Sequence, residues 1–442
     1  MKYFTGEGGV VERGSVEGRM ASVSILTQGC SANQSDSEAM AGVLEREGFF
    51  LIDDPSEADV VVVNTCTVKG PTEAALRRIL SRLDPAKVVL AGCVPQADPA
   101  SFTEYARLGP GQLDKVAEAA RARLEGKALT FLGRREEAER LSLPSVRRNR
   151  FVEVVPIAQG CLSACAFCKT KHARGALRSY PVDAVVRRVS GAVAEGAREV
   201  WLTSQDCGAY GKDKGSSLAE LLRAVLTIPR KFKIRVGMAN PEHCKGMIDE
   251  LISAFRDERV YKFLHVPVQA GSERVVRAMR RGHTVDDFTR VVAAFRKVFP
   301  RITIATDIIC GYPGETREDF EETLSLVHEV RPDVVNISRF WPRPGTPAAR
   351  LRPLPGWEVK RRSGELTSLF QRIALENNKQ WMGWEGGVLF TEKGKEGTVI
   401  GRNDAYKQVV VRGGEELLGK RKRVRVEEVS SFDVRGRVIG AD

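Results

Sequence analysis

The sequence predicts an α/β protein in three parts: an N-terminal open parallel sheet with helices, a central partial (βα)6 barrel, and a small C-terminal antiparallel β-barrel. Apolar strand candidates alternate with amphipathic helices over residues 21–127. Six further strand–helix units run over residues 150–378, fewer than the eight that close a full barrel. Short alternating runs with glycine-rich turns replace the helical pattern over residues 379–442. Residues 1–20 are expected to be a tail, and the charged, irregular stretch 128–149 a linker.

The first part contains three apolar runs at residues 22–26, 60–64 and 87–92, each long enough for one buried strand. An amphipathic helix between the last two opens at Pro71, because proline fits the first turn of a helix. This alternation predicts a parallel sheet covered by helices on both faces.

The central part shows six strand candidates, which begin near Phe151, Glu199, Ile234, Tyr261, Ile302 and Val334. Its first helix illustrates the pattern. Pro181 opens that helix, and valines at helical spacing then fall on one face: Val182, Val185, Val186, Val189 and Val193.

Composition narrows the class of partner. Sixty-nine Lys and Arg residues against fifty-seven Asp and Glu residues leave a net charge of +12, which favours a polyanion. No apolar run is long enough to span a membrane, and the glycine-rich, charged N-terminus has no apolar core of an export signal. We therefore expect a cytoplasmic protein without membrane contact, whose nine cysteines are reduced and serve metal binding or catalysis.

The strongest motif is GCLSACAFC, which places Cys161, Cys165 and Cys168 just after the first strand of the central part. Three thiolates this close can bind three irons of an iron–sulfur cube and leave the fourth iron open. A zinc site completed by His172 is the alternative. The spacing on a strand–helix loop, with aromatic Phe167 before the last cysteine, favours the cluster.

A second set, Cys30, Cys66 and Cys93, is scattered in sequence, but each cysteine follows a predicted strand: SILTQGC, VVVNTC and VVLAGC. Parallel strands end at one edge of an open sheet, where such proteins bind ligands. Three thiols at that edge could hold a second cube with one open iron. The alternative is that these are ordinary small core residues.

The combination resembles the methylthiotransferases of the radical S-adenosylmethionine (SAM) superfamily, over nearly the whole chain from about residue 20. The matching phrases include QGCSANQSDSE, NTCTVKGPTE, GCLSACAFCKTKHARG, TDIICGYPGET and PRPGTPAA. NTCTVK, CKTKHARG and RVGMANP are most similar to the archaeal and eukaryotic subgroup that modifies N6-threonylcarbamoyladenosine in tRNA. The C-terminal part resembles their TRAM domain, an RNA-binding module.

The resemblance implies an enzyme that adds a methylthio group to carbon 2 of N6-threonylcarbamoyladenosine at tRNA position 37, in the anticodon loop. It implies two [4Fe-4S] clusters and SAM. The cluster of Cys161, Cys165 and Cys168 would cleave SAM to a radical, and that of Cys30, Cys66 and Cys93 would carry the sulfur. An electron donor and a sulfur source are further implied partners. The target base would lie between the two cubes.

Polar residues at the ends of the later strands are candidates for SAM binding: Ser204, Gln205, Asp206, Arg235, Gln269 and Asp307. They could serve the ribose hydroxyls and the carboxylate of SAM, and Phe167 joins them as a cofactor-binding candidate. Cys207, Cys244 and Cys310 lie outside both triplets and are expected to be core thiols.

RNA contacts are expected from a dense basic run in the last part and from two residues on an earlier hairpin: Lys420, Arg421, Lys422, Arg423, Arg425, Arg402 and Lys407. Small β-barrels often bind nucleic acid, and Lys and Arg supply the phosphate contacts. The alternative is a solvated charged face. RRGH at 280–283 and SRFWPRPGT at 338–346 are expected to add contacts near the mouth of the barrel.

Two other functions stay open. One is a methylthiotransferase with another substrate, either isopentenyladenosine or a ribosomal-protein side chain. The other is a non-catalytic RNA-binding protein that holds iron–sulfur or zinc.

Overall fold

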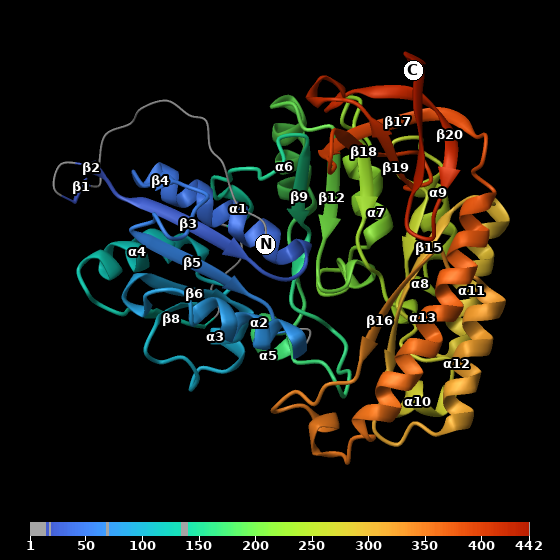
Figure 1. Ribbon diagram of the computed structural model, residues 1–442, viewed down its shortest axis with the longest axis horizontal. Helices are drawn as coiled ribbons and strands as arrows, with labels where there is room; N and C mark the ends of the chain where they lie inside the picture. Colours follow the sequence, from blue (N-terminus) through green and yellow to red (C-terminus); the bar gives the residue numbers. More distant parts are fainter. Residues whose placement is uncertain (1–14, 17–18, 68–69, 134–139, 442) are drawn as a thin grey trace. The chain divides into compact units, whose positions relative to one another are not determined.

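The computed structural model describes residues 15–16, 19–67, 70–133 and 140–441 (Figure 1). The chain forms two compact units. The first unit holds the described residues up to Arg148, Val154–Leu162 and Cys168–Ala184, and the second holds Asn149–Glu153, Ser163–Phe167 and the residues from Val185 onward. The expected tail lies mostly outside the described residues, apart from the short strands β1 (Ser15–Val16) and β2 (Arg19–Met20).

A parallel six-stranded sheet with the order β4-β3-β5-β6-β7-β8 forms the first unit. Its strands are β3 (Ser22–Thr27), β4 (Phe50–Leu51), β5 (Val60–Thr65), β6 (Val88–Gly92), β7 (Ala106–Leu108) and β8 (Thr130–Phe131). Strand β5 is buried along its whole length, as expected for a parallel sheet that is covered on both faces. The three predicted strands are confirmed as β3, β5 and β6.

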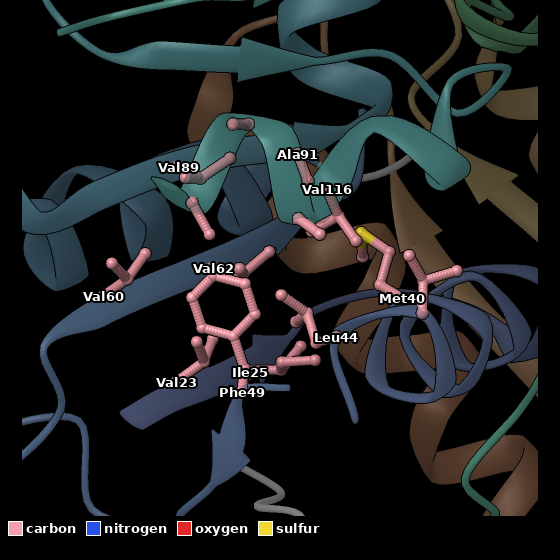
Figure 2. Close-up of a cluster of buried hydrophobic side chains, with 14 of the residues drawn as sticks. Val23, Ile25, Met40, Leu44, Phe49, Val60, Val62, Val89, Ala91 and Val116 are labelled. Atoms are coloured by element: carbon pink, nitrogen blue, oxygen red, sulfur yellow. The ribbon is translucent and has the colours of Figure 1, made fainter. Parts of the chain in front are cut away.

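Helices that follow the strands of this sheet cover its two faces. They are α1 (Ser31–Arg46), α2 (Gly70–Leu80), α3 (Cys93–Ala97) and α4 (Val116–Leu124). On one face, Val60 and Val62 of β5 belong to the same core as Met40 of α1 (Figure 2). On the other face, Val61 joins a core that contains Leu76 of α2. Successive strand residues therefore face opposite cores.

The order of the strands reverses next to β3. Strand β4 lies on one side of β3, while β5 and the later strands lie on the other. Helices α1 and α2, which follow β3 and β5, belong to opposite cores. The carboxyl ends of β3 and β5 thus form the topological switch point, the place at which open parallel sheets bind ligands.

The stretch 128–149, expected as a linker, belongs largely to the first unit. Strand β8 adds a sixth strand to the sheet. Leu143 and Val146 pack against the core that contains α1, and the Val146 N–H donates a hydrogen bond to the Glu38 carbonyl (2.9 Å). Residues 134–139 lie outside the described residues. The many charged residues of the stretch hid the signal of its two apolar core contacts, Leu143 and Val146.

The central part contains the six predicted parallel strands. They are β9 (Val152–Pro156), β12 (Glu199–Thr203), β13 (Lys233–Val236), β14 (Phe263–His265), β15 (Thr303–Cys310) and β16 (Val334–Arg339). They form two three-stranded sheets, ordered β13-β12-β9 and β14-β15-β16, and an isolated parallel bridge from Ile234 to Val260 connects β13 toward the second sheet. The partial barrel is confirmed.

Helices connect these strands. They are α6 (Val182–Ala194), α7 (Leu218–Val225), α8 (Pro241–Cys244), α9 (Ile248–Phe255), α10 (Glu273–Ala278), α11 (Val285–Val298), α12 (Arg317–Val330) and α13 (Gly356–Lys379). The valine face predicted for the first of them is buried at Val185, Val189 and Val193.

A small closed barrel of five strands follows α13, as the sequence predicted. Its strands, in the order β17-β18-β19-β21-β20, are β17 (Glu385–Lys393), β18 (Thr398–Arg402), β19 (Gln408–Arg412), β20 (Arg421–Val429) and β21 (Val434–Ala441). However, β19 and β21 pair in parallel, while the other neighbouring strands are antiparallel. The hairpin between β18 and β19 packs on the central part. The Lys262 N–H, just before β14, donates to the Asp404 carbonyl (2.8 Å), and Lys407 pairs with Asp333, just before β16 (3.1 Å).

The small barrel therefore sits at the amino ends of the central strands, opposite the ends toward which β12 and β16 point (Figure 1). The ring of Tyr406, from the β18–β19 hairpin, lies 4.8 Å from the rings of Tyr261 and Phe263. The guanidinium of Arg235 lies over the Trp201, Phe263 and Tyr406 rings. This stack closes the amino end of the partial barrel.

Among the helices of the described residues, none combines the length and the apolar character that a membrane span requires.

Candidate functional site

The structure brings Cys30, Cys66 and Cys93 together at the switch point of the first unit. Cys30 precedes the first turn of α1, Cys66 follows β5 directly, and Cys93 begins α3 after β6. The Oδ1 atom of Asn33 lies 3.8 Å from the Sγ atoms of both Cys30 and Cys93. A Cβ atom on Gly29 would stand 2.9 Å from the Cys66 Sγ, so only glycine fits there, with its φ of +106°.

Asn33 is held in place by the backbone of the neighbouring strand. Its Nδ2 donates to the Thr65 carbonyl (2.6 Å), and Asn64 Nδ2 donates to the Asn33 carbonyl (2.8 Å). Sequence reasoning missed Asn33. The signal lay in α1, whose first turns bury a run of polar residues that an ordinary amphipathic helix would expose: Asn33, Ser35, Asp36, Ser37 and Glu38.

Two arginines and one aspartate lie beside these thiols. Arg174, at the end of α5 (Thr170–Arg174), donates from Nη2 to Asn33 Oδ1 (3.0 Å) and to Asp36 Oδ2 (2.5 Å). Arg140 pairs with the other oxygen of Asp36. Burial alone would raise the pKa of Asp36, but these two guanidinium groups hold it below its ordinary value. The carboxylate is therefore ionised, and the trio carries a net charge of +1.

The excess positive charge fits an anionic group held by the thiols. Burial raises the pKa of the Cys93 thiol, while Arg174 acts in the opposite direction by charge and by a hydrogen bond. All three cysteines are free of disulfides. Three thiolates beside a buried cation are the donor set that an iron–sulfur cube with one open iron requires.

The CxxxCxxC loop is divided between the two units. Cys161 and Cys168 belong to the first unit, and Cys165 to the second. The Cys161 N–H donates to the Gly175 carbonyl (3.1 Å), and the Cys168 Sγ accepts from the Thr170 N–H (3.4 Å).

Within the second unit, the Cys165 Sγ accepts a hydrogen bond from Arg281 Nη1 (3.1 Å). Cys161, Cys165 and Cys168 are all partly exposed, as ligands of a group that must meet a substrate need to be. His172, the fourth ligand of the zinc alternative, is exposed on α5. Across the described part of the chain, no three His, Cys, Asp or Glu side chains lie close enough to hold a single metal ion.

Arg281 belongs to a buried network behind Cys165 that sequence reasoning missed. Its guanidinium also binds the Asn240 side chain, whose Nδ2 donates to Asp206 (2.5 Å). The second oxygen of Asp206 accepts from the backbone N–H groups of Gly208 (3.0 Å) and Asn240 (3.1 Å). Burial raises the pKa of Asp206, against the opposing charge of nearby His243. Asp206, a candidate for SAM binding, is fully buried and positions Asn240 and Arg281 instead.

Arg235 lies in β13, the third of the predicted strands, as expected. Its side chain is committed to the aromatic stack at the amino end of the barrel, away from the strand ends that carry ligand sites in such barrels.

Of the other SAM candidates, Ser204 and Gln205 follow β12, Gln269 follows β14, and Asp307 lies within β15. Ser204 donates to the Cys207 Sγ (3.4 Å), and Asp307 accepts from Asn336 Nδ2 (2.6 Å). Gln269 adopts a positive φ of 75°, uncommon for a residue with a side chain, and so marks a backbone under constraint. Gln205 and Phe167 are partly buried, and Phe167 packs against the cluster that contains Ala166.

Cys207, Cys244 and Cys310 are buried core thiols, as expected. Burial raises the pKa of Cys207 to about 11 and that of Cys310 to about 12, and it raises the pKa of Cys244 further. They therefore stay protonated at neutral pH.

The basic residues predicted to contact RNA fall into two groups. Lys407 is buried in its ion pair with Asp333, and Arg402 is mostly buried, with Nη2 3.2 Å from Glu392. Lys407 holds the small barrel to the central part, whereas Arg402 pairs with Glu392 of β17 inside the barrel. Both side chains are engaged within the protein, so neither stands as an RNA contact. The basic run on and before β20 is more exposed: Lys420, Arg421, Lys422, Arg423 and Arg425.

Three sequence profiles match the chain. The Radical SAM superfamily matches residues 155–327, the TRAM domain residues 385–439, and the Uncharacterized protein family UPF0004 residues 22–108. The radical S-adenosylmethionine methyltransferase TsrM from Kitasatospora setae, solved with cobalamin and a [4Fe-4S] cluster, shares the fold. Its TM-score is 0.53 at 18% identity, over 75% of this chain and 74% of that chain. The fold and the cysteine loop together define a radical SAM protein.

Relatives of known name narrow the class. The "Probable threonylcarbamoyladenosine tRNA methylthiotransferase" of Archaeoglobus fulgidus is 46% identical, over 88% of this chain and 93% of that protein. The threonylcarbamoyladenosine tRNA methylthiotransferases of Danio rerio and Homo sapiens are 43% and 40% identical, over 99% and 94% of this chain and 82% and 73% of those proteins. The chain belongs to the threonylcarbamoyladenosine tRNA methylthiotransferase family.

Proposed function

We propose that this chain adds a methylthio group to carbon 2 of N6-threonylcarbamoyladenosine at position 37, in the anticodon loop of tRNA. The observation that carries the proposal is the gathering of three thiols beside a buried net positive charge, in a chain with a second three-cysteine loop. A single three-thiol site would serve radical chemistry alone, whereas a second one provides a separate place for sulfur.

Cys161, Cys165 and Cys168 would hold one [4Fe-4S] cluster, and Cys30, Cys66 and Cys93 the other. When bound, the clusters and SAM would supply an electron, a radical able to break the inert C–H bond of the adenine ring, and the sulfur and methyl group. An external electron donor and an external sulfur source complete the reaction.

The side chains of this protein orient the cysteine ligands and supply positive charge beside them. Arg281 donates to the Cys165 sulfur, and the buried Asn240–Asp206 pair fixes the direction of Arg281. Arg174 supplies positive charge to the thiols of the first unit. Hydrogen bonds and charges of this kind around a cluster sulfur set its reduction potential. Ser204, Gln205, Gln269 and Asp307 are proposed to hold SAM.

The TRAM barrel is proposed to bind the tRNA backbone through its basic run. Phosphate contacts by Lys and Arg provide affinity without reading sequence, so the choice of the modified base must come from elsewhere in the protein. Because its substrate is tRNA, we place the enzyme in the cytoplasm.

The test uses the full chain, reconstituted without oxygen with iron and sulfide and supplied with SAM and a chemical reductant. Anticodon stem-loops that carry N6-threonylcarbamoyladenosine, isopentenyladenosine or plain adenosine at position 37 serve as substrates. We expect the methylthio nucleoside only from the first RNA, detected by mass spectrometry after digestion.

Two variants separate the roles of the thiols. Cys165→Ala should reduce formation of 5′-deoxyadenosine to background. Cys66→Ala should leave SAM cleavage in place and abolish methylthiolation. Unchanged SAM cleavage in Cys165→Ala, or a methylthio product from Cys66→Ala, would contradict the assignment. Zinc in place of iron in the reconstituted protein would contradict it as well.

A further inference from the structure

The segment that follows β16 exposes a large aromatic side chain next to the cysteine loop. Trp341 comes two residues after the end of β16, and 58% of its surface is exposed. Tryptophan is enriched at interfaces, because its ring is apolar while its N–H can stay hydrogen-bonded. In Figure 1 this segment lies beyond the arrowheads of β12 and β16, at the end of the barrel opposite β17–β20.

The neighbours of Trp341 are fixed to the loop that carries the cysteines. Phe340 and Ala348 belong to the same buried cluster as Ala166, which lies between Cys165 and Cys168. The Ala348 N–H donates to the Ala166 carbonyl (2.9 Å). Phe340 packs edge-on against Tyr312, with 5.5 Å between the ring centroids. Trp341 is therefore held within one residue of a cluster that includes the cysteine loop.

The segment is stiff. Between Trp341 and Trp357 it contains five prolines: Pro342, Pro344, Pro347, Pro353 and Pro355. A tight turn closes its middle, where Thr346 donates from its backbone N–H (3.0 Å) and its Oγ1 (2.8 Å) to the Arg343 carbonyl. Proline fixes φ and lowers the entropy that binding would otherwise cost. The backbone that carries the exposed ring is thus already ordered before RNA binds.

The charge of the segment selects an anionic occupant. No Asp or Glu occurs from residue 340 to 357, whereas Arg350 and Arg352 are exposed on either side of Leu351, which is itself 49% exposed. A segment that exposes both an aromatic ring and cations suits an unstacked base with its phosphates. An apolar protein partner would not require the two arginines.

We propose that Trp341, Arg350 and Arg352 form a platform for single-stranded RNA, on which a nucleotide next to the target base stacks on Trp341 while the arginines hold its phosphates. This inference rests on the proposed function, because it names how the RNA loop is held beside the cysteine loop. It also provides the loop recognition that phosphate contacts by the TRAM barrel do not supply.

The test compares two RNAs of equal length and charge, an anticodon stem-loop and a fully paired duplex, by fluorescence anisotropy with the full reconstituted chain. The loop preference is the ratio of the duplex Kd to the stem-loop Kd. Trp341→Ala should lower this ratio about five- to 150-fold, the effect typical of alanine substitution at base-stacking residues. Trp341→Phe should retain most of the preference, since a smaller ring can still stack.

Phe432→Ala is the matched control, because Phe432 is an exposed aromatic residue (72%) on the TRAM barrel, far from β16 in sequence. It should leave the loop preference unchanged. If Trp341→Ala keeps the loop preference while wild type methylthiolates the RNA, the platform is overturned and the proposed function stands. If Trp341→Ala loses the preference but wild type produces no methylthio nucleoside, the platform stands as an RNA site and the proposed function fails.

Discussion

Arg174 follows the CxxxCxxC loop in sequence and serves the other set of cysteines. It follows Cys168 by six positions, on a helix that begins two residues after that cysteine. Its side chain nevertheless ends at Asn33 and Asp36, beside the thiols of the first sheet. Burial would lower the pKa of Arg174, but Asp36, Cys93 and Cys30 raise it well above its ordinary value. The guanidinium is therefore charged at neutral pH.

Replacing Arg174 with Met should lower the free energy of unfolding by about 3–5 kcal/mol, since a broken buried ion pair leaves a buried charge with fewer partners. Urea unfolding measures the change. The exposed Arg82→Met in the same unit should change it by less than about 0.5 kcal/mol. The double variant Arg174→Met/Asp36→Asn should regain part of the loss. Equal stability of Arg174→Met and wild type would show that the pair does not hold this site together.

At the scale of elements, the β18–β19 hairpin is the joint between the TRAM barrel and the central strands. Tyr406 lies in the left-handed region, with φ of +61°, which is strained for a residue with a side chain. The strain is compensated by the two aromatic contacts that the ring makes with Tyr261 and Phe263. The left-handed backbone at Tyr406 therefore serves to place its ring against those of Tyr261 and Phe263.

Tyr406→Ala should lower the free energy of unfolding by about 2–4 kcal/mol. This is slightly less than the loss of a fully buried ring, because Tyr406 is only partly buried. Calorimetry should then show the TRAM barrel melting separately from the central part, where wild type shows one joint transition. Tyr406→Phe keeps the ring and should melt like wild type. A single unchanged transition in Tyr406→Ala would mean that the ion pairs of Lys407 and Asp404 hold the joint without the ring.

At the scale of the whole molecule, the net charge of +12 favours RNA binding, but many of the positive side chains are already paired with carboxylates. Arg421 pairs with Asp404 (2.9 Å), and Arg423 pairs with Glu385 (3.1 Å). Lys407 is buried in its own pair, and Arg425 lies 3.9 Å from Glu385. The residues of the basic run best placed to meet phosphate are therefore Lys420 and Lys422.

The variant Lys420→Ala/Lys422→Ala should weaken binding of duplex RNA and lower the slope of log K against log salt by about 0.7–0.9 per lysine. Anisotropy titrations at several salt concentrations measure the slope. Lys395→Ala, an exposed lysine on the β17–β18 turn, serves as the control and should leave the slope unchanged. An unaltered slope in the double variant would place the phosphate contacts on another face.

The sequence was sufficient for the strands and for the places of the cysteines, because apolar runs and strand ends are local patterns. Asn33, Arg140, Arg174 and Arg281 could not be found in this way, since each acts through a partner far along the chain. Arg174 and Asp36 are separated by 138 positions. The same reason explains why the expected roles of Lys407 and Arg235 do not fit their surroundings. A charge run predicts exposure, but tertiary packing buried Lys407 against Asp333 and fixed Arg235 among rings.

The stack at the amino end of the barrel bears on how the RNA-binding domain can be studied. A chain cut after α13 would leave the faces of Tyr261 and Phe263 and the guanidinium of Arg235 uncovered. Such a fragment would be a damaged catalyst, and its lost activity would say little about tRNA affinity. The TRAM barrel and the central part share a buried contact surface. A swap or redesign of one domain would therefore require matching changes in the other.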